Sequence, residues 1–67
     1  MFQKLVFKAA IVARGYSVEK LAKESEIGKV SLYNKINSGR FMRGEIEKVA
    51  SVLNLSDAEI INIFFCR

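Results

Sequence analysis

The sequence predicts one compact all-α domain of five short helices, and three observations indicate it. Apolar residues recur at spacings of three and four, the period of an amphipathic helix. The alternating pattern of a strand bounded by turn residues does not appear in the sequence. The 67 residues include no proline, repeat or low-complexity segment, so residues 1–67 are expected to form a single domain.

The first predicted helix covers about residues 2–14. Leu5, Ala9 and Val12 share one face at spacings of four and three, with Phe2 as a further candidate, and we expect this face to point into the core. Gly15 follows the last turn, where glycine commonly ends a helix.

The second predicted helix covers residues 18–24, and the third follows Gly28 and continues to about residue 37. Ser17 can cap the second helix, because its hydroxyl oxygen can accept a hydrogen bond from an unpaired amide. The segment NSGR, residues 37–40, ends the third helix. The expected inward residues are Leu21 and Ala22, Ile27 in the turn, and Leu32 and Ile36.

The fourth predicted helix covers about residues 44–54, and the fifth about residues 60–65. The fifth follows a capping box in SDAE, where Ser56 and Glu59 each satisfy an unpaired amide. Five helices joined by turns of a few residues are expected to pack as a compact globule. The inward stripe of the fourth helix is Ile46, Val49, Ala50 and Leu53.

The net charge of +4 is concentrated in one segment. Residues 28–43 contain four basic and no acidic residues, whereas the rest of the chain contains seven of each. Such a segment favours a polyanionic partner such as double-stranded DNA, and a chance cluster on a solvated face is the alternative. The four residues are Lys29, Lys35, Arg40 and Arg43.

Several function classes are not expected. The chain has no histidine, no glycine-rich phosphate loop and a single cysteine, so we predict no enzyme, metal site, cofactor or small-molecule substrate. A lone thiol, Cys66, is typical of a reduced cytoplasmic protein. The amino-terminal apolar run is interrupted by Lys8 and is too short for a membrane span, so no membrane partner is expected.

Residues 17–37 have the spacing of a helix-turn-helix, which is two short helices joined by a tight turn. With the apolar residues directed inward, four residues of the third helix must point outward, and their types suit a DNA major groove. Lysine can donate to guanine or phosphate, asparagine pairs with adenine, and valine contacts the thymine methyl group. The four are Lys29, Val30, Tyr33 and Asn34.

The segment YSVEKLAKESEIGKVSLYNKINSG resembles the Cro/C1-type helix-turn-helix of phage repressors and related bacterial regulators. The likeness covers about residues 5–65 and continues through EIEKVASVLNLSDAEIINIFF. It implies a lambda-repressor-like domain and a sequence-specific transcriptional regulator, namely a small Cro-like repressor of a phage or prophage. It also implies the cytoplasm and nucleoid of a bacterial host cell as its location, with an operator in double-stranded DNA as its partner.

The sequence departs from this family at the reading positions. Glu26 stands where a glycine usually adopts the left-handed turn, at a cost of roughly 1 kcal/mol. Gly28 replaces the serine that usually opens the third helix, and Val18 replaces a phosphate-bracing glutamine. Lys29 and Val30 replace paired glutamines, so no known operator can be assigned to this chain.

The resemblance and the outward positions together imply two sets of DNA contacts. We expect the bases to be read by Lys29, Val30, Tyr33, Asn34 and Asn37, and the phosphates to be bound by Ser17, Gly28, Lys35, Arg40 and Arg43. Three of these positions also have a structural alternative: Tyr33 folded onto the apolar body, Asn34 simply solvated, and Lys29 an ordinary surface residue.

The carboxyl-terminal helix is apolar nearly all round. We expect a homodimer contact at Ile61, Phe64 and Phe65, which would place two copies on half-sites about 10 bp apart. The alternative is that a small domain needs these side chains for its own core. A second function class follows from the same helix: a protein-interaction module of the antirepressor or antitoxin type.

Overall fold

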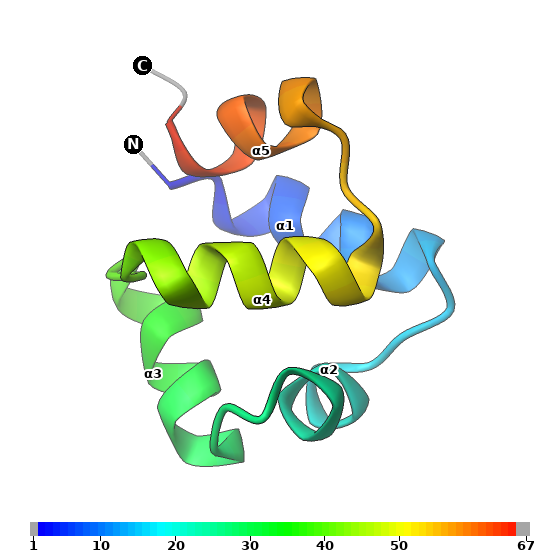
Figure 1. Cartoon of the computed structure of the whole chain (residues 1–67). Helices are drawn as coiled ribbons and strands as arrows, with labels where there is room; N and C mark the ends of the chain where they lie inside the picture. Colours follow the sequence, from blue (N-terminus) through cyan, green and yellow to red (C-terminus); the bar gives the residue numbers. More distant parts are fainter. Residues whose placement is uncertain (1, 66–67) are drawn as a thin grey trace.

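The computed structural model describes residues 2–65, which form five α-helices and no strand (Figure 1). The all-α prediction is therefore confirmed, while the lambda-repressor-like arrangement remains a prediction. The helices are α1 (Lys4–Ala13), α2 (Val18–Ser25), α3 (Lys29–Ser38), α4 (Arg43–Leu53) and α5 (Asp57–Phe64). The fifth helix begins three residues earlier than expected because Asp57 directly follows the Ser56 cap.

Helix α4 crosses the middle of the domain and separates two pairs of helices (Figure 1). Helices α2 and α3 pack against each other on one side, and α1 and α5 lie together on the other. The amide of Gln3 donates a hydrogen bond of 2.7 Å to the carbonyl of Ile63, which joins the segment before α1 to α5. The segment before α1 also reaches the carboxyl end of α3, where Phe2 and Lys4 line a hollow together with Asn37.

The helix ends follow from local chemistry that the sequence predicted. Gly15 adopts a left-handed φ of 74° after α1, and the amide of Tyr16 donates back to the Ile11 carbonyl. The Ser17 hydroxyl accepts a hydrogen bond from the Lys20 amide at 3.1 Å, which caps α2. The capping box of α5 and a left-handed glycine, Gly39, at the end of α3 are also present.

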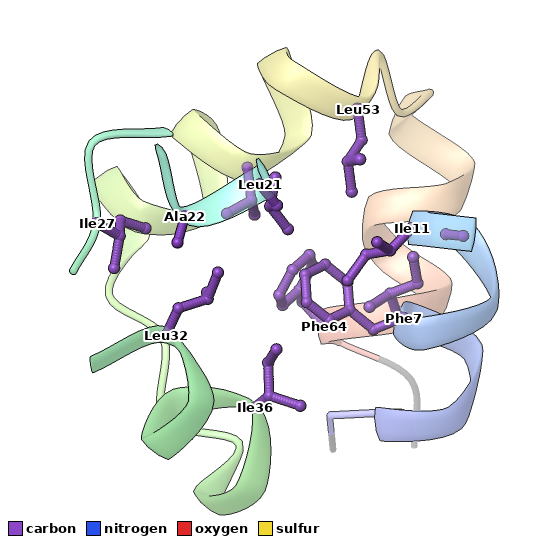
Figure 2. Packing of buried hydrophobic residues seen from close by; sticks show 12 residues of the cluster. Phe7, Ile11, Leu21, Ala22, Ile27, Leu32, Ile36, Leu53 and Phe64 are labelled. Carbon is purple, nitrogen blue, oxygen red and sulfur yellow. The ribbon is translucent and has the colours of Figure 1, made fainter. Parts of the chain in front are cut away.

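Four phenylalanine rings form the aromatic centre of the core. Every pair among the four has its ring centroids between 5.2 and 5.8 Å apart, a spacing at which aromatic rings attract. Phe7 and Phe64 point toward each other in Figure 2. The cluster consists of Phe2, Phe7, Phe41 and Phe64. From the sequence, Phe2 was a candidate inward residue and Phe64 either a dimer contact or a core residue, whereas Phe7 and Phe41 had no predicted role.

The prediction of which face of α1 points into the core is wrong. Leu5 and Val12 are 80% and 73% exposed, and Ala9 is exposed as well. The buried residues lie on the opposite side of the helix and are Phe7, Ala10 and Ile11. Both sides of α1 carry apolar residues at helical spacing, and the core takes the side with the larger ring because it buries more apolar area.

Arg14 fastens three helices together. Its guanidinium donates to both carboxylate oxygens of Glu59 at 2.8 Å, and its Nε donates to the Leu53 carbonyl at 2.8 Å. Both bonds to Glu59 come from one terminal nitrogen, Nη2, and they are strengthened by the opposite charges of the two groups. The end of α1 is thereby held to the end of α4 and to the first turn of α5.

Candidate nucleic-acid interface

The turn between α2 and α3 is fixed by packing and by one left-handed residue. Glu26 has a φ of 61°, and the amide of Ile27 donates to the Ala22 carbonyl at 3.1 Å. The side chains of Ala22 and Ile27 are both buried, as the sequence predicted. The buried hydroxyl of Ser25 donates to the Leu21 carbonyl at 2.7 Å, so the last turn of α2 leaves no unsatisfied polar side-chain atom.

Helix α3 has one buried and one solvent-facing side. Leu32 and Ile36 are buried in the core, and Figure 2 shows both pointing into it. Three of the predicted base-reading residues are exposed and follow one another at spacings of four and three, so they share the opposite side of the helix. These residues are Val30, Asn34 and Asn37.

Lys29 occupies the edge of this side, next to α2. Its Nζ lies 3.0 Å from Oε1 of Glu19, a residue in the first turn of α2. The hydrogen bond that Lys29 donates to Glu19, together with the negative charge of Glu19, raises the pKa of Lys29 above the ordinary value of 10.5. Lys29 is therefore an exposed cation that already has an anionic partner.

Tyr33 lies one turn after Lys29 on the same edge of this side, and there it faces α1 and the start of α2. It is partly exposed and borders a shallow groove of about 280 Å³ beside Val12 and Tyr16. The sequence left two alternatives for Tyr33, a side chain that reads bases and one folded onto the apolar body. Its side chain does part of each, because it lines the groove and still reaches the surface.

The predicted phosphate-binding residues fall into two groups. Lys35 is partly buried, and its Nζ lies 2.9 Å from Oε2 of Glu45, so its expected contact with phosphate is not supported. Glu45 also accepts a hydrogen bond from the Met42 amide, which holds the ion pair at the start of α4. Arg40 and Arg43 are exposed and form no ion pair with the residues that the structure describes.

Ser17 and Gly28 are the N-caps of α2 and α3. The Ser17 hydroxyl is engaged with the Lys20 amide, whereas Gly28 offers no side-chain cap. Both residues are exposed, at the ends of the two helices nearest the Lys29 edge of α3.

Two of the three residues predicted to form a dimer contact are accessible to solvent. Ile61 and Phe65 are exposed on α5, but Phe64 is buried in the aromatic cluster and is unavailable to a partner. Phe64 therefore follows the alternative interpretation, in which a small domain needs the ring for its own core.

Sequence reasoning missed the two acids that compensate the basic segment. Glu19 and Glu45 lie outside residues 28–43 and meet Lys29 and Lys35 only because α2 and α4 pack beside α3. The spacing of charges along the chain carries no signal for contacts between helices. Two of the four basic residues in the segment are consequently neutralised by neighbours.

Other site types have no support in the described part of the chain. Residues 2–65 contain no group of three potential metal ligands among histidine, cysteine, aspartate and glutamate. None of the described helices has both the length and the apolar character required to cross a bilayer. Comparisons with protein-family models, curated proteins and solved structures found no significant match to this chain.

Proposed function

We propose that the chain is a sequence-specific DNA-binding regulator in which α2 and α3 act as a helix-turn-helix and α3 enters the major groove. The observation that carries this proposal is the exposed side of α3, where Val30, Asn34 and Asn37 face solvent beside two uncompensated arginines. A solvent-facing row of this kind has no role in holding the domain together, since the core uses the opposite side of the helix.

The residue types on this row match base edges. Asn34 and Asn37 can each donate to and accept from adenine, and the methyl groups of Val30 can contact the methyl group of thymine. Lys29 and Tyr33, one turn apart, lie along one edge of the row and add contacts there. We therefore propose an operator rich in A·T pairs at the positions under the middle of α3.

Arg40 and Arg43 supply the contacts that do not depend on sequence. Arg40 lies just beyond the end of α3, and Arg43 begins α4, so both charges are at the carboxyl end of the proposed reading helix. Contacts of this kind position a protein on the duplex and make its affinity fall as salt rises. The lambda-repressor-like arrangement and a repressor role complete the proposal.

The test is selection of tight sites from a randomised duplex pool, followed by salt titration on the selected and on random DNA. Asn34→Ala is expected to relax specificity at one base pair, a loss of roughly 5- to 100-fold there. Asn62→Ala, at an exposed asparagine on α5, is the matched control. A folded protein that selects no sequence and binds no duplex at low salt would overturn the proposal.

Arg40→Gln tests the phosphate contacts separately. We expect it to weaken selected and random DNA alike and to lower the slope of log affinity against log salt by about one. Lys48→Gln removes one exposed positive charge from α4 and serves as its control. Equal effects of the two variants would show that net charge, and not the position of Arg40, determines binding.

A second candidate function is a protein-interaction module that uses α5. The supporting observation is the exposure of Ile61 and Phe65, two large apolar side chains one turn apart. Sedimentation of the chain with and without its selected duplex separates the candidates. Two copies per site that become one in Phe65→Ser would support a homodimer on DNA, whereas failure to bind duplex would favour the protein-interaction module.

A further inference from the structure

The two ion pairs of α3 differ in how firmly they are held. The side chains of Lys35 and Glu45 are 23% and 22% exposed, and Glu45 is also fixed by the Met42 amide. The side chains of Lys29 and Glu19 are 57% and 65% exposed, and they share only the contact with each other. An exposed pair of this kind contributes little to folding and opens readily. The Lys29–Glu19 pair is therefore free to respond to a ligand.

We infer that Glu19 determines the specificity of DNA binding by competing with DNA for Lys29. This inference rests on the proposed function of α3. In the unbound protein the Glu19 carboxylate holds the Lys29 ammonium, and a DNA phosphate must both displace this carboxylate and approach its negative charge. Random DNA is bound mainly through its phosphates, so Lys29 gains only this unfavourable replacement of carboxylate by phosphate.

A guanine edge offers a better exchange. Its N7 and O6 are two acceptors without a full negative charge, so they can bind the ammonium without repelling Glu19. The ammonium has three donors and can keep one on the carboxylate while it donates to guanine. Glu19 thus disfavours phosphate contacts more than base contacts, and a repulsive group of this kind raises specificity by weakening the wrong complex.

The decisive variant is Glu19→Gln, measured on random duplex and on the selected site. We expect random DNA to bind about fivefold more tightly, with the salt slope increased by about one because Lys29 can then neutralise a phosphate. The selected site gains less, so the ratio of specific to random affinity falls. Circular dichroism confirms that each variant is folded.

Glu24→Gln is the matched control, because Glu24 is an exposed acid on the same helix and forms no ion pair within residues 2–65. It changes the net charge equally without releasing Lys29. Equal effects of Glu19→Gln and Glu24→Gln on both duplexes would overturn the inference. If the unmodified protein binds DNA, that result leaves the proposed function intact; if it binds none, the proposed function itself fails.

The pair can also be tested from its other side. In the Lys29→Gln background the contact between residues 19 and 29 is already absent. Adding Glu19→Gln to this variant should therefore change the preference for selected over random DNA no more than adding Glu24→Gln does. A persistent change would show that Glu19 acts independently of Lys29 and would overturn the inference.

Discussion

The outward sides of α1 and α3 differ in chemistry, although both helices have ten residues and the same spacing of outward positions. The outward row of α1 is Leu5, Ala9 and Val12, which is entirely apolar. The outward row of α3 contains two asparagines. In α3 the polar row shows from the sequence which side faces solvent. In α1 both sides are apolar, so the sequence does not decide which side faces the core.

The largest effect should come from a substitution on the inward side of α1, compared with one on its outward side. Phe7→Ala removes a fully buried ring from the aromatic cluster and is expected to cost about 3–5 kcal/mol of unfolding free energy. Leu5→Ala removes an exposed side chain and should cost less than about 0.5 kcal/mol. Urea unfolding followed by circular dichroism measures both. Comparable losses would contradict the orientation of α1.

The glycines that end the two helices provide the next test. Gly15 and Gly39 have the same φ of 74°, so alanine is strained at both. A Cβ at Gly39 would also lie 3.1 Å from the Cβ of Phe2, whereas Gly15 has open space. We expect Gly15→Ala to cost about 1 kcal/mol and Gly39→Ala about 2 kcal/mol. Equal losses in chemical denaturation would place Phe2 away from Gly39.

Two carboxylates, one beside α1 and one beside α3, should make the stability of the fold sensitive to acid. The Ser56 amide and Arg14 lower the pKa of Glu59 beside α1, and the Met42 amide and Lys35 lower that of Glu45 beside α3, from an ordinary value of 4.5. A carboxyl with a lowered folded-state pKa stabilises the fold above its unfolded-state value, and this contribution is lost as the pH falls through the folded-state value.

The stability of the native chain should therefore decline as the pH falls below about 4.5. Glu59→Gln and Glu45→Gln should each be less stable than the native chain at pH 7 and should lose less stability on acidification. Urea midpoints at pH 7 and pH 3 measure this difference, with exposed Glu47→Gln as the control. An unchanged pH dependence in both variants would contradict the assigned contacts.

The smallest expected effect is a gain at the start of α3. Gly28 has ordinary negative φ, and a Cβ there would meet only Ser31, at 3.7 Å or more. Gly28→Ser should add the missing side-chain cap and stabilise the fold by a few tenths of a kcal/mol, which raises the melting temperature by about 1–3 °C. Gly28→Ala is the control because it adds the Cβ without the hydroxyl. A lower melting temperature for serine than for alanine would contradict the cap.

The sequence predicted what local chemistry decides. Ser17, Gly15 and the Ser56–Glu59 box act through neighbours a few residues away, and the structure has each of these caps at the predicted residues, although α5 begins at Asp57 and not at residue 60. The inward residues of α3 were also predictable, since Leu32 and Ile36 are the only large aliphatic side chains on their side of the helix.

Contacts between distant residues were not predictable. The four phenylalanines of the aromatic cluster come from three separate parts of the chain, with Phe2 and Phe7 in the first, and Arg14 meets Glu59 across 45 positions. Lys29 and Lys35 were correctly recognised as part of a basic segment, but their partners Glu19 and Glu45 depend on how the helices pack. The accessible charge of the candidate site was therefore overestimated from the sequence.

The hydrogen bond between Gln3 and Ile63 has a consequence for the topology of the chain. Because it joins positions 60 residues apart, the backbone of the folded domain is nearly a closed ring. A short peptide linker between the segment before Gln3 and the segment after Ile63 could complete this ring beside α1 and α5. Such backbone cyclisation would restrict the unfolded chain far more than the folded one, and so would stabilise the domain while its exposed helix stays accessible.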